Sequence, residues 1–66
     1  MKNSVRDLRK RRGLTQEQLA EIIGVSRQTV NAIEKEKFDP SLTTAFKMSK
    51  LFELPIEECF FYEDFK

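Results

Sequence analysis

Residues 15–34 read TQEQLAEIIGVSRQTVNAIE, in which two short helical patterns are separated by one glycine. Thr15 and Gln18 have the spacing of a capping box, in which both side chains satisfy backbone groups at a helix start. Gly24 lacks the Cβ atom that hinders a left-handed helix end, and Ser26 is placed to cap a second helix. Apolar residues recur at helical spacing along both segments: Leu19, Ala20, Ile22, Ile23, Val25, Val30 and Ile33. The stretch therefore predicts two helices joined by a tight turn.

This pair of helices meets the requirements of a helix-turn-helix unit. Its helices cross near a right angle, so a small residue is needed where they touch, and Ala20 provides it. The turn needs a residue without Cβ clashes, which Gly24 supplies, and apolar residues stand on both sides of it. Because all of these requirements are met within one short window, we predict a helix-turn-helix unit over residues 15–34.

Helical patterns continue on both sides of this unit. Val5 and Leu8 indicate a first helix, with Asn3 or Ser4 able to cap it and Gly13 after its end. A fourth helix is predicted beyond the turn that precedes Ser41, and its apolar face is expected to consist of Leu42, Ala45, Phe46, Met48, Ser49 and Phe52.

A fifth helix and a tail complete one small domain. Pro55 suits a first helical position, and a short helix is predicted from there to Cys59. The chain of 66 residues can build one small core, so we predict a single all-α domain of five helices over residues 1–66. The one cysteine cannot form a disulfide within the chain and is expected to be a reduced core residue. A cytoplasmic protein is expected, because the sequence contains neither a membrane span nor a signal-peptide pattern.

The net charge of +1 conceals an asymmetry along the chain. Residues 1–12 contain six Lys or Arg residues and one Asp, whereas residues 53–66 contain five acidic residues and one Lys. A nearly neutral protein can therefore present a basic face to an anionic partner and keep an acidic end away from it. A solvated basic surface without a partner is the other interpretation of the same charges.

Residues 13–54 resemble the XRE family, the Cro and lambda-repressor type of helix-turn-helix regulator. The resemblance is carried by LTQEQLAEIIGVSRQTVNAIEK and by DPSLTTAFKMSKLFELP. The whole chain is most similar to the small stand-alone homodimeric members of that family. The resemblance implies a compact five-helix, lambda-repressor-like domain that binds double-stranded DNA and acts as a repressor at an inverted repeat.

The resemblance also implies which side chains read bases. The third helix of this fold lies in the major groove, where Arg27 is suited to guanine and Gln28 to adenine. Asn31 lies one turn on from Gln28 on the same face, and Ala32 is small enough to meet a thymine methyl group. A solvated helix face is the alternative interpretation of these polar residues.

A second set of residues is expected to contact phosphates, which position a protein without reading sequence. Gln16 resembles the family's phosphate-binding position at the start of the second helix, and Lys35 and Lys37 resemble its backbone-clamping loop. Ser26 and Thr29 are suited either to phosphate oxygens or to capping alone.

Three further positions concern the stability of this arrangement. Arg9 and Glu34 occupy positions where the resemblance implies an ion pair between the first helix and the end of the third. Two separate solvated charges are the alternative. Glu36 departs from the family's glycine or asparagine at the left-handed end of the third helix, so either that helix ends differently here or the loop is strained.

The C-terminal segment, residues 54–66, is predicted to form a homodimer interface. A domain this small has too little interior to bury all of its aliphatic and aromatic residues there. The predicted interface consists of Leu54, Ile56, Phe60, Phe61, Tyr62 and Phe65. The two aromatic tails of a dimer are compatible with a short antiparallel β-ribbon. Alternatively, Ile56, Cys59 and Phe60 complete the core and the remaining residues fray.

An enzyme is not expected. The sequence has no histidine, no nucleophile beside a base, no glycine-rich phosphate loop and no set of metal ligands. Neither a cofactor nor a small-molecule effector nor a membrane partner is indicated. The rival class is a protein-interaction module, such as an antitoxin-like subunit whose aromatic tail binds another protein.

Overall fold

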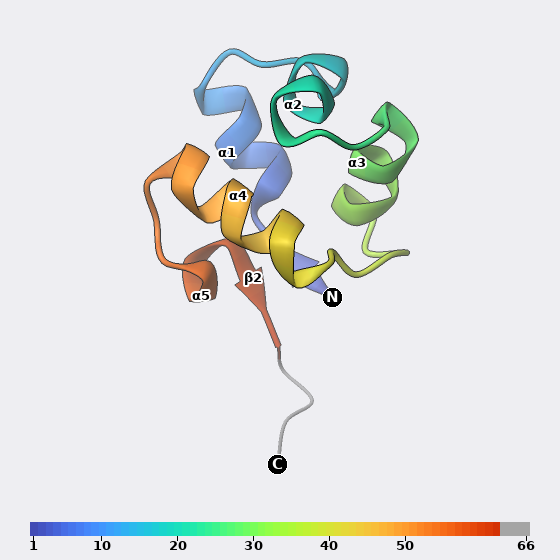
Figure 1. Ribbon diagram of the computed structural model, residues 1–66. Coiled ribbons are helices and arrows are strands. Elements are labelled where there is room, and N and C mark those ends of the chain that lie inside the picture. Colours follow the sequence, from blue (N-terminus) through green and yellow to red (C-terminus); the bar gives the residue numbers. More distant parts are fainter. Residues whose placement is uncertain (63–66) are drawn as a thin grey trace.

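The computed structural model describes residues 1–62. Its elements, in chain order, are β1 (Lys2–Asn3), α1 (Val5–Arg11), α2 (Gln16–Ile23), α3 (Arg27–Glu34), α4 (Leu42–Phe52), α5 (Ile56–Cys59) and β2 (Phe60–Phe61) (Figure 1). The predicted five-helix fold is confirmed, and a two-stranded sheet is added to it. Within residues 1–62, no helix is long and apolar enough to cross a membrane.

Hydroxyl side chains at the caps explain why three of the helices begin where they do. The Thr15 hydroxyl accepts a hydrogen bond from the Gln18 backbone N–H at 3.0 Å, and the Gln18 Oε1 accepts one from the Thr15 N–H at 2.9 Å. Ser26 caps α3 by accepting from the backbone N–H of Thr29 at 3.0 Å. Ser41 caps α4 through the corresponding hydrogen bond.

The start of α1 uses a neighbouring side chain instead. Ser4 occupies the cap position without a capping hydrogen bond from its side chain, and its hydroxyl donates to the Glu58 carbonyl at 2.9 Å. The Asn3 Oδ1 accepts from the Val5 backbone N–H at 3.1 Å. Of the two predicted candidates, Asn3 is therefore the one whose side chain satisfies the first turn of α1.

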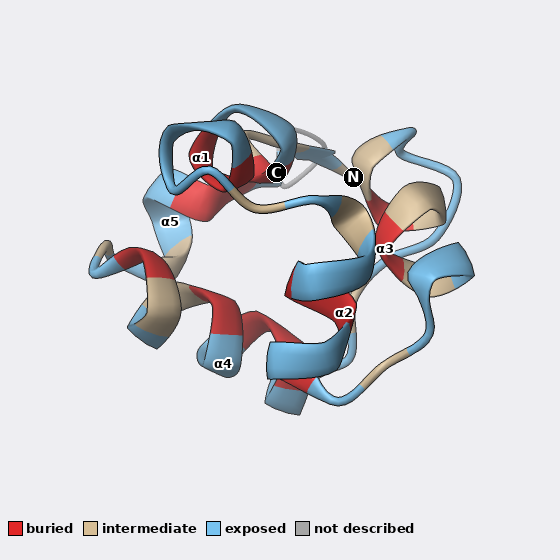
Figure 2. Cartoon of the chain, turned by 90° about the horizontal axis from the view of Figure 1, so that it is seen from above, coloured by how far each residue is buried: buried red, intermediate tan, exposed pale blue. Residues whose placement is uncertain are grey.

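The core lies where the inner faces of the helices meet (Figure 2). Its buried apolar residues come from all five helices and from β2: Val5, Leu8, Leu19, Ala20, Ile23, Val30, Ile33, Ala45, Met48, Phe52, Cys59 and Phe60. Cys59 is fully buried and not in a disulfide, and burial raises the pKa of its thiol. This cysteine therefore packs as a small apolar side chain, as the sequence predicts.

Part of the predicted apolar face of α4 is wrong. Leu42 and Phe46 are 71% and 50% exposed, whereas Thr44 is buried. Successive helical residues turn by about 100°, so the buried residues Thr44, Ala45, Met48 and Phe52 share one arc of α4. Phe46 falls nearly opposite that arc. Ile22 of α2 is likewise exposed, because it lies beside the strip that faces the core.

The sheet ties the two ends of the described chain together. β2 pairs with β1 antiparallel, with Asn3 opposite Phe60 and Lys2 opposite Phe61. A β-ribbon is thus present, but it forms within one chain. Phe60 is only 6% exposed and packs in the core of its own chain, so its prediction as a dimer-interface residue is corrected. Phe65, from the same predicted interface, lies outside the described residues.

Two of the helices end at a glutamate in the left-handed conformation. Glu36 follows α3 with φ of +62°, and Glu53 follows α4 with φ of +56°. After α3, the Glu36 N–H donates to the Ile33 carbonyl at 3.0 Å and the Lys37 N–H donates to the Ala32 carbonyl at 2.9 Å. These two bonds form the Schellman arrangement that normally employs glycine. The helix therefore ends in the family's geometry, and Glu36 is the strained residue.

We expect Glu36→Gly to stabilise the fold relative to Glu36→Ala by about 1 kcal/mol, because glycine adopts positive φ without a Cβ clash. Both substitutions remove the same charge, so their difference isolates the backbone term. Urea denaturation of the two variants measures it. Equal unfolding free energies would show that the left-handed conformation at this position is not strained.

Candidate nucleic-acid interface

The turn between α2 and α3 is held by several hydrogen bonds. The backbone N–H groups of Gly24 and Val25 both donate to the Ala20 carbonyl, at 2.8 and 3.0 Å. Gly24 has φ of +86°, so it serves the left-handed role predicted for it. Lys47 of α4 donates from Nζ to the Ile23 carbonyl at 3.1 Å, which satisfies the end of α2. These contacts fix the direction in which α3 leaves the turn.

Helix α3 presents one face to the core and the other to the exterior at one side of the domain (Figures 1 and 2). Val30 and Ile33 are buried and anchor the inner face. Four residues with helical spacing occupy the outer strip: Arg27, Gln28, Asn31 and Ala32. The first two are exposed and the last two are half-buried. The structure thus places the predicted base-reading residues side by side on a surface strip.

Ser26 and Thr29 are engaged with each other at the start of this helix. Their hydroxyl oxygens are 2.9 Å apart, and Ser26 also accepts from the Thr29 backbone N–H. Both residues line a hollow of about 380 Å³ beside α3, together with Gln28, Ala32, Lys37 and Phe38. The hollow brings the loop after α3 next to the outer strip. Lys37 is therefore positioned beside the residues predicted to read bases.

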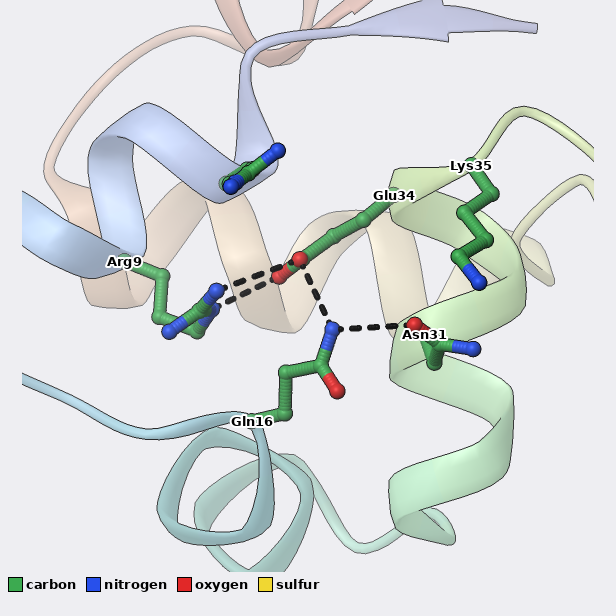
Figure 3. A pocket seen from close by; sticks show the side chains of 6 residues that line it. Arg9, Gln16, Asn31, Glu34 and Lys35 are labelled. Atoms are coloured by element: carbon green, nitrogen blue, oxygen red, sulfur yellow. Dashed lines mark hydrogen bonds and ion pairs between the residues drawn. The ribbon is translucent and has the colours of Figure 1, made fainter.

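A second hollow, of about 260 Å³, lies between α1, the start of α2 and the end of α3 (Figure 3). Its lining is polar and charged: Arg6, Arg9, Gln16, Asn31, Glu34 and Lys35. Lys35, predicted as a phosphate contact, lies here rather than in the hollow of Lys37. At the end of α3, one lysine thus lines each of the two hollows.

The buried part of this second hollow is an ion pair. Arg9 Nε lies 2.7 Å from Glu34 Oε2, and Arg9 Nη2 lies 3.2 Å from Glu34 Oε1. The remaining terminal nitrogen of Arg9 donates to the Leu14 carbonyl at 2.8 Å. Only 10% of the arginine side chain and 4% of the glutamate side chain are exposed. The pair is bidentate and largely desolvated, which ties α1 to the end of α3.

Gln16 extends the ion pair to the outer strip. Its Nε2 donates to Glu34 Oε1 at 3.0 Å and to Asn31 Oδ1 at 3.2 Å (Figure 3). The side chain predicted to contact phosphate is therefore engaged inside the domain. Sequence reasoning missed this connection, because Gln16 and Glu34 are separated by 18 positions.

Arg6 is a candidate contact that the sequence analysis did not select. It is exposed and lines the hollow together with Lys35 and Asn31. The available signal was its spacing from Arg9, since residues three apart share a helix face. Arg12, by contrast, pairs with Glu53 at 3.1 Å. Within residues 1–62, Arg9 and Arg12 both contact carboxylates of the same chain.

Comparison with known proteins decides the family. The helix-turn-helix family model matches residues 5–59. The chain belongs to this helix-turn-helix family. An HTH-type transcriptional regulator of Methanocaldococcus jannaschii is 56% identical over 64 residues, which cover 97% of each chain. The transcriptional repressor RstR of a cryptic CTXphi phage, from Vibrio cholerae, is 43% identical over 85% of this chain and 50% of its own.

A solved structure resembles the helix-turn-helix protein over most of its length. The restriction-modification controller protein C.AhdI of Aeromonas hydrophila superposes with a TM-score of 0.75 at 32% identity, covering 85% of each chain. Family and fold agree that this is a DNA-binding transcriptional regulator of the XRE type and not an enzyme. The predicted family and function class are confirmed at this level.

Removing Arg9 should destabilise this helix-turn-helix protein more than removing Arg11 or Arg12, which follow it closely in the chain. Arg9→Ala leaves the Glu34 carboxylate buried with Gln16 as its neutral donor, so we expect a loss of about 1–3 kcal/mol in unfolding free energy. Arg12→Ala breaks only an exposed pair, and Arg11→Ala changes an exposed side chain, so each should change stability by less than about 0.5 kcal/mol. Thermal and urea unfolding compare the three variants. Equal losses of unfolding free energy in the three variants would show that the buried ion pair does not stabilise the fold.

Proposed function

We propose that this protein is a homodimeric repressor that binds an inverted-repeat operator in double-stranded DNA, with α3 in the major groove. The observation that carries the proposal is the outer strip of α3. Arg27, Gln28 and Asn31 point away from the core while Val30 and Ile33 anchor the same helix. A rigid helix with several polar side chains on one exposed face is what base-edge reading requires.

The side chains of the strip suit different bases. A guanidinium group can donate two hydrogen bonds to the O6 and N7 of guanine, which suits Arg27. A glutamine can pair with the N6 and N7 of adenine, which suits Gln28. Ala32 adds a small apolar surface for a thymine methyl group. We propose that these residues, with Asn31, select the sequence of each half-site.

Residues around the strip are proposed to hold the phosphates. Lys37 lies beside the strip in one hollow, and Lys35 with Arg6 lies in the other. Cations on both sides of a recognition helix can contact the two strands that border a major groove. The hydroxyl groups of Ser26 and Thr29 hydrogen-bond to each other, and the one that accepts in this pair still has an O–H that can donate to a phosphate oxygen.

The proposed dimer forms through the C-terminal side of the domain. Phe61 and Tyr62 are 39% and 65% exposed, and Leu54 and Ile56 are half-buried. α5 lies across the domain from α3 (Figures 1 and 2), so an interface there leaves the outer strip free. Two recognition helices related by a two-fold axis read an inverted repeat, with half-sites about 34 Å apart.

The repressor role is proposed by analogy. The Vibrio cholerae relative is named as a transcriptional repressor. That match extends over 85% of the present chain, and the matched region includes the outer strip.

Base-reading and phosphate-binding residues should respond differently to substitution. Selection of bound DNA from a random pool gives the operator, and competition assays then compare variants. Arg27→Ala and Gln28→Ala should each lower specific binding by about 1–3 kcal/mol and relax the preference at one position. Lys37→Ala should weaken all sequences equally and reduce the salt dependence by about one phosphate contact. An Arg27→Ala variant with unchanged preferences would show that α3 is docked in a different register.

Dimerisation should depend on the two exposed aromatic residues at the end of β2 and directly after it. Light scattering at micromolar concentration should show a dimer for the native chain and a monomer for the double variant Phe61→Thr, Tyr62→Thr, in which threonine maintains the strand propensity. Ile22→Ser and Phe38→Ser, each in a residue that is 54% exposed, are the matched controls and should remain dimeric. A monomeric native chain would reject the dimer and favour the second candidate, in which these aromatic residues bind a different protein.

A further inference from the structure

The hydrogen bonds around Glu34 have directions that chemistry alone dictates. An arginine side chain can only donate, and an ionised carboxylate can only accept. Because Arg9 holds Glu34 in a bidentate pair, the group that Gln16 turns toward Glu34 must be its NH₂. Gln16 therefore has no freedom to exchange its nitrogen and oxygen.

The same constraint passes from Gln16 to Asn31. The Gln16 Nε2 has two hydrogens, and it donates one to Glu34 Oε1 and the other to Asn31 Oδ1, at 3.0 and 3.2 Å. The atom of Asn31 that faces Gln16 must accept, so it must be the oxygen. The Asn31 Nδ2 then points away from Gln16 (Figure 3), and Asn31 itself lies half-buried on the outer strip of α3. An isolated asparagine can present either atom, whereas here the choice is made before any ligand arrives.

We propose that Asn31 is a specificity-determining residue that acts as an oriented hydrogen-bond donor, and that Gln16 is the positioning residue that orients it. This inference rests on the proposed function. In the major groove, an oriented donor finds acceptors on guanine, on adenine N7 and on thymine O4. Cytosine presents its N4 amino group, which is a donor. Asn31 therefore discriminates against cytosine at one position of each half-site.

The geometry also revises the expected role of Gln16. Both hydrogens of its side-chain amide are used within the domain, and the atom that remains is the acceptor Oε1. A phosphate oxygen would be repelled by that atom. A phosphate at the start of α2 would therefore be bound by the backbone N–H of Gln16, and the side chain would serve Asn31 instead.

Two substitutions separate these roles. Asn31→Asp replaces the outward NH₂ by an oxygen, while the inward oxygen still accepts from Gln16. The preference at one position should then move toward cytosine, by about tenfold relative to the native protein, because an aspartate accepts from the cytosine N4. Gln16→Met maintains the length of the side chain but removes both donors, so the preference should relax at that same position and remain unchanged elsewhere.

The test is binding-site selection with the native protein and both variants, and Lys37→Met is the control for a lost phosphate contact. If the native protein enriches no sequence, the proposed function fails. If it enriches an operator but Asn31→Asp retains every base preference, the inference about Asn31 is overturned. If Gln16→Met weakens all sequences equally, as Lys37→Met should, the side chain of Gln16 is a phosphate contact and not a positioning residue.

A measurement on the free protein covers the case in which a variant does not fold. Hydrogen exchange of side-chain amides by NMR should show slow exchange for the Gln16 NH₂ group and fast exchange for that of Asn31. The reverse order would overturn the proposed orientation without any reference to DNA.

Discussion

The carboxylate of Glu34 is the point on which the outer surface of the domain depends. It lies at the end of α3, it is almost completely buried, and its charge is matched by Arg9 of α1. Gln16, the first residue of α2, donates to the same carboxylate. One acidic group thereby connects three helices, and the position of α3 relative to the others is set by directional bonds as well as by apolar packing.

In this arrangement the ion pair joins two helices and also orients the neighbouring side-chain amides. A buried pair is weak evidence for stability, because desolvation offsets much of the attraction. Here the pair also determines which way the side-chain amide of Gln16 is turned. Through the hydrogen bond from Gln16, it determines the orientation of the Asn31 amide on the outer strip as well. Apolar residues of similar volume in place of the pair would fill the same space, but the Gln16 amide would then have no carboxylate to accept its hydrogen bond and fix its orientation. The charged pair in this place therefore organises the surface as well as the core.

The sequence predicted the helices well because their signals are local. The caps at Thr15 and Ser26 and the left-handed turn at Gly24 each depend on a few adjacent residues. The outer strip of α3 followed from the same short-range pattern, whereas the choice of base-reading candidates came from the resemblance to the XRE family. The contact of Gln16 with Asn31 could not be predicted, since it depends on how two helices cross.

Other sequence-based predictions were wrong, or were missing, for equally specific reasons. Periodicity placed Leu42 and Phe46 on the apolar side of α4, but it does not say how wide the buried arc is in a small domain. The strands are two residues long, too short to show alternation, and they pair residues from opposite ends of the chain. An aromatic cluster near the C-terminus was recognisable, but its division between core and surface was not. Phe60 enters the core and Phe61 does not, because successive strand residues face opposite sides.

The pairing of β1 with β2 has a consequence for how the protein is made. During synthesis, α1, α2 and α3 leave the ribosome in order, and contacts between neighbours in sequence can form early. β1 leaves the ribosome before α1, yet its partner β2 follows only after α5. Until then the core to which Val5 and Leu8 belong lacks Cys59 and Phe60. The nascent chain thus carries α3 for some time before the two-stranded sheet that completes the domain can form.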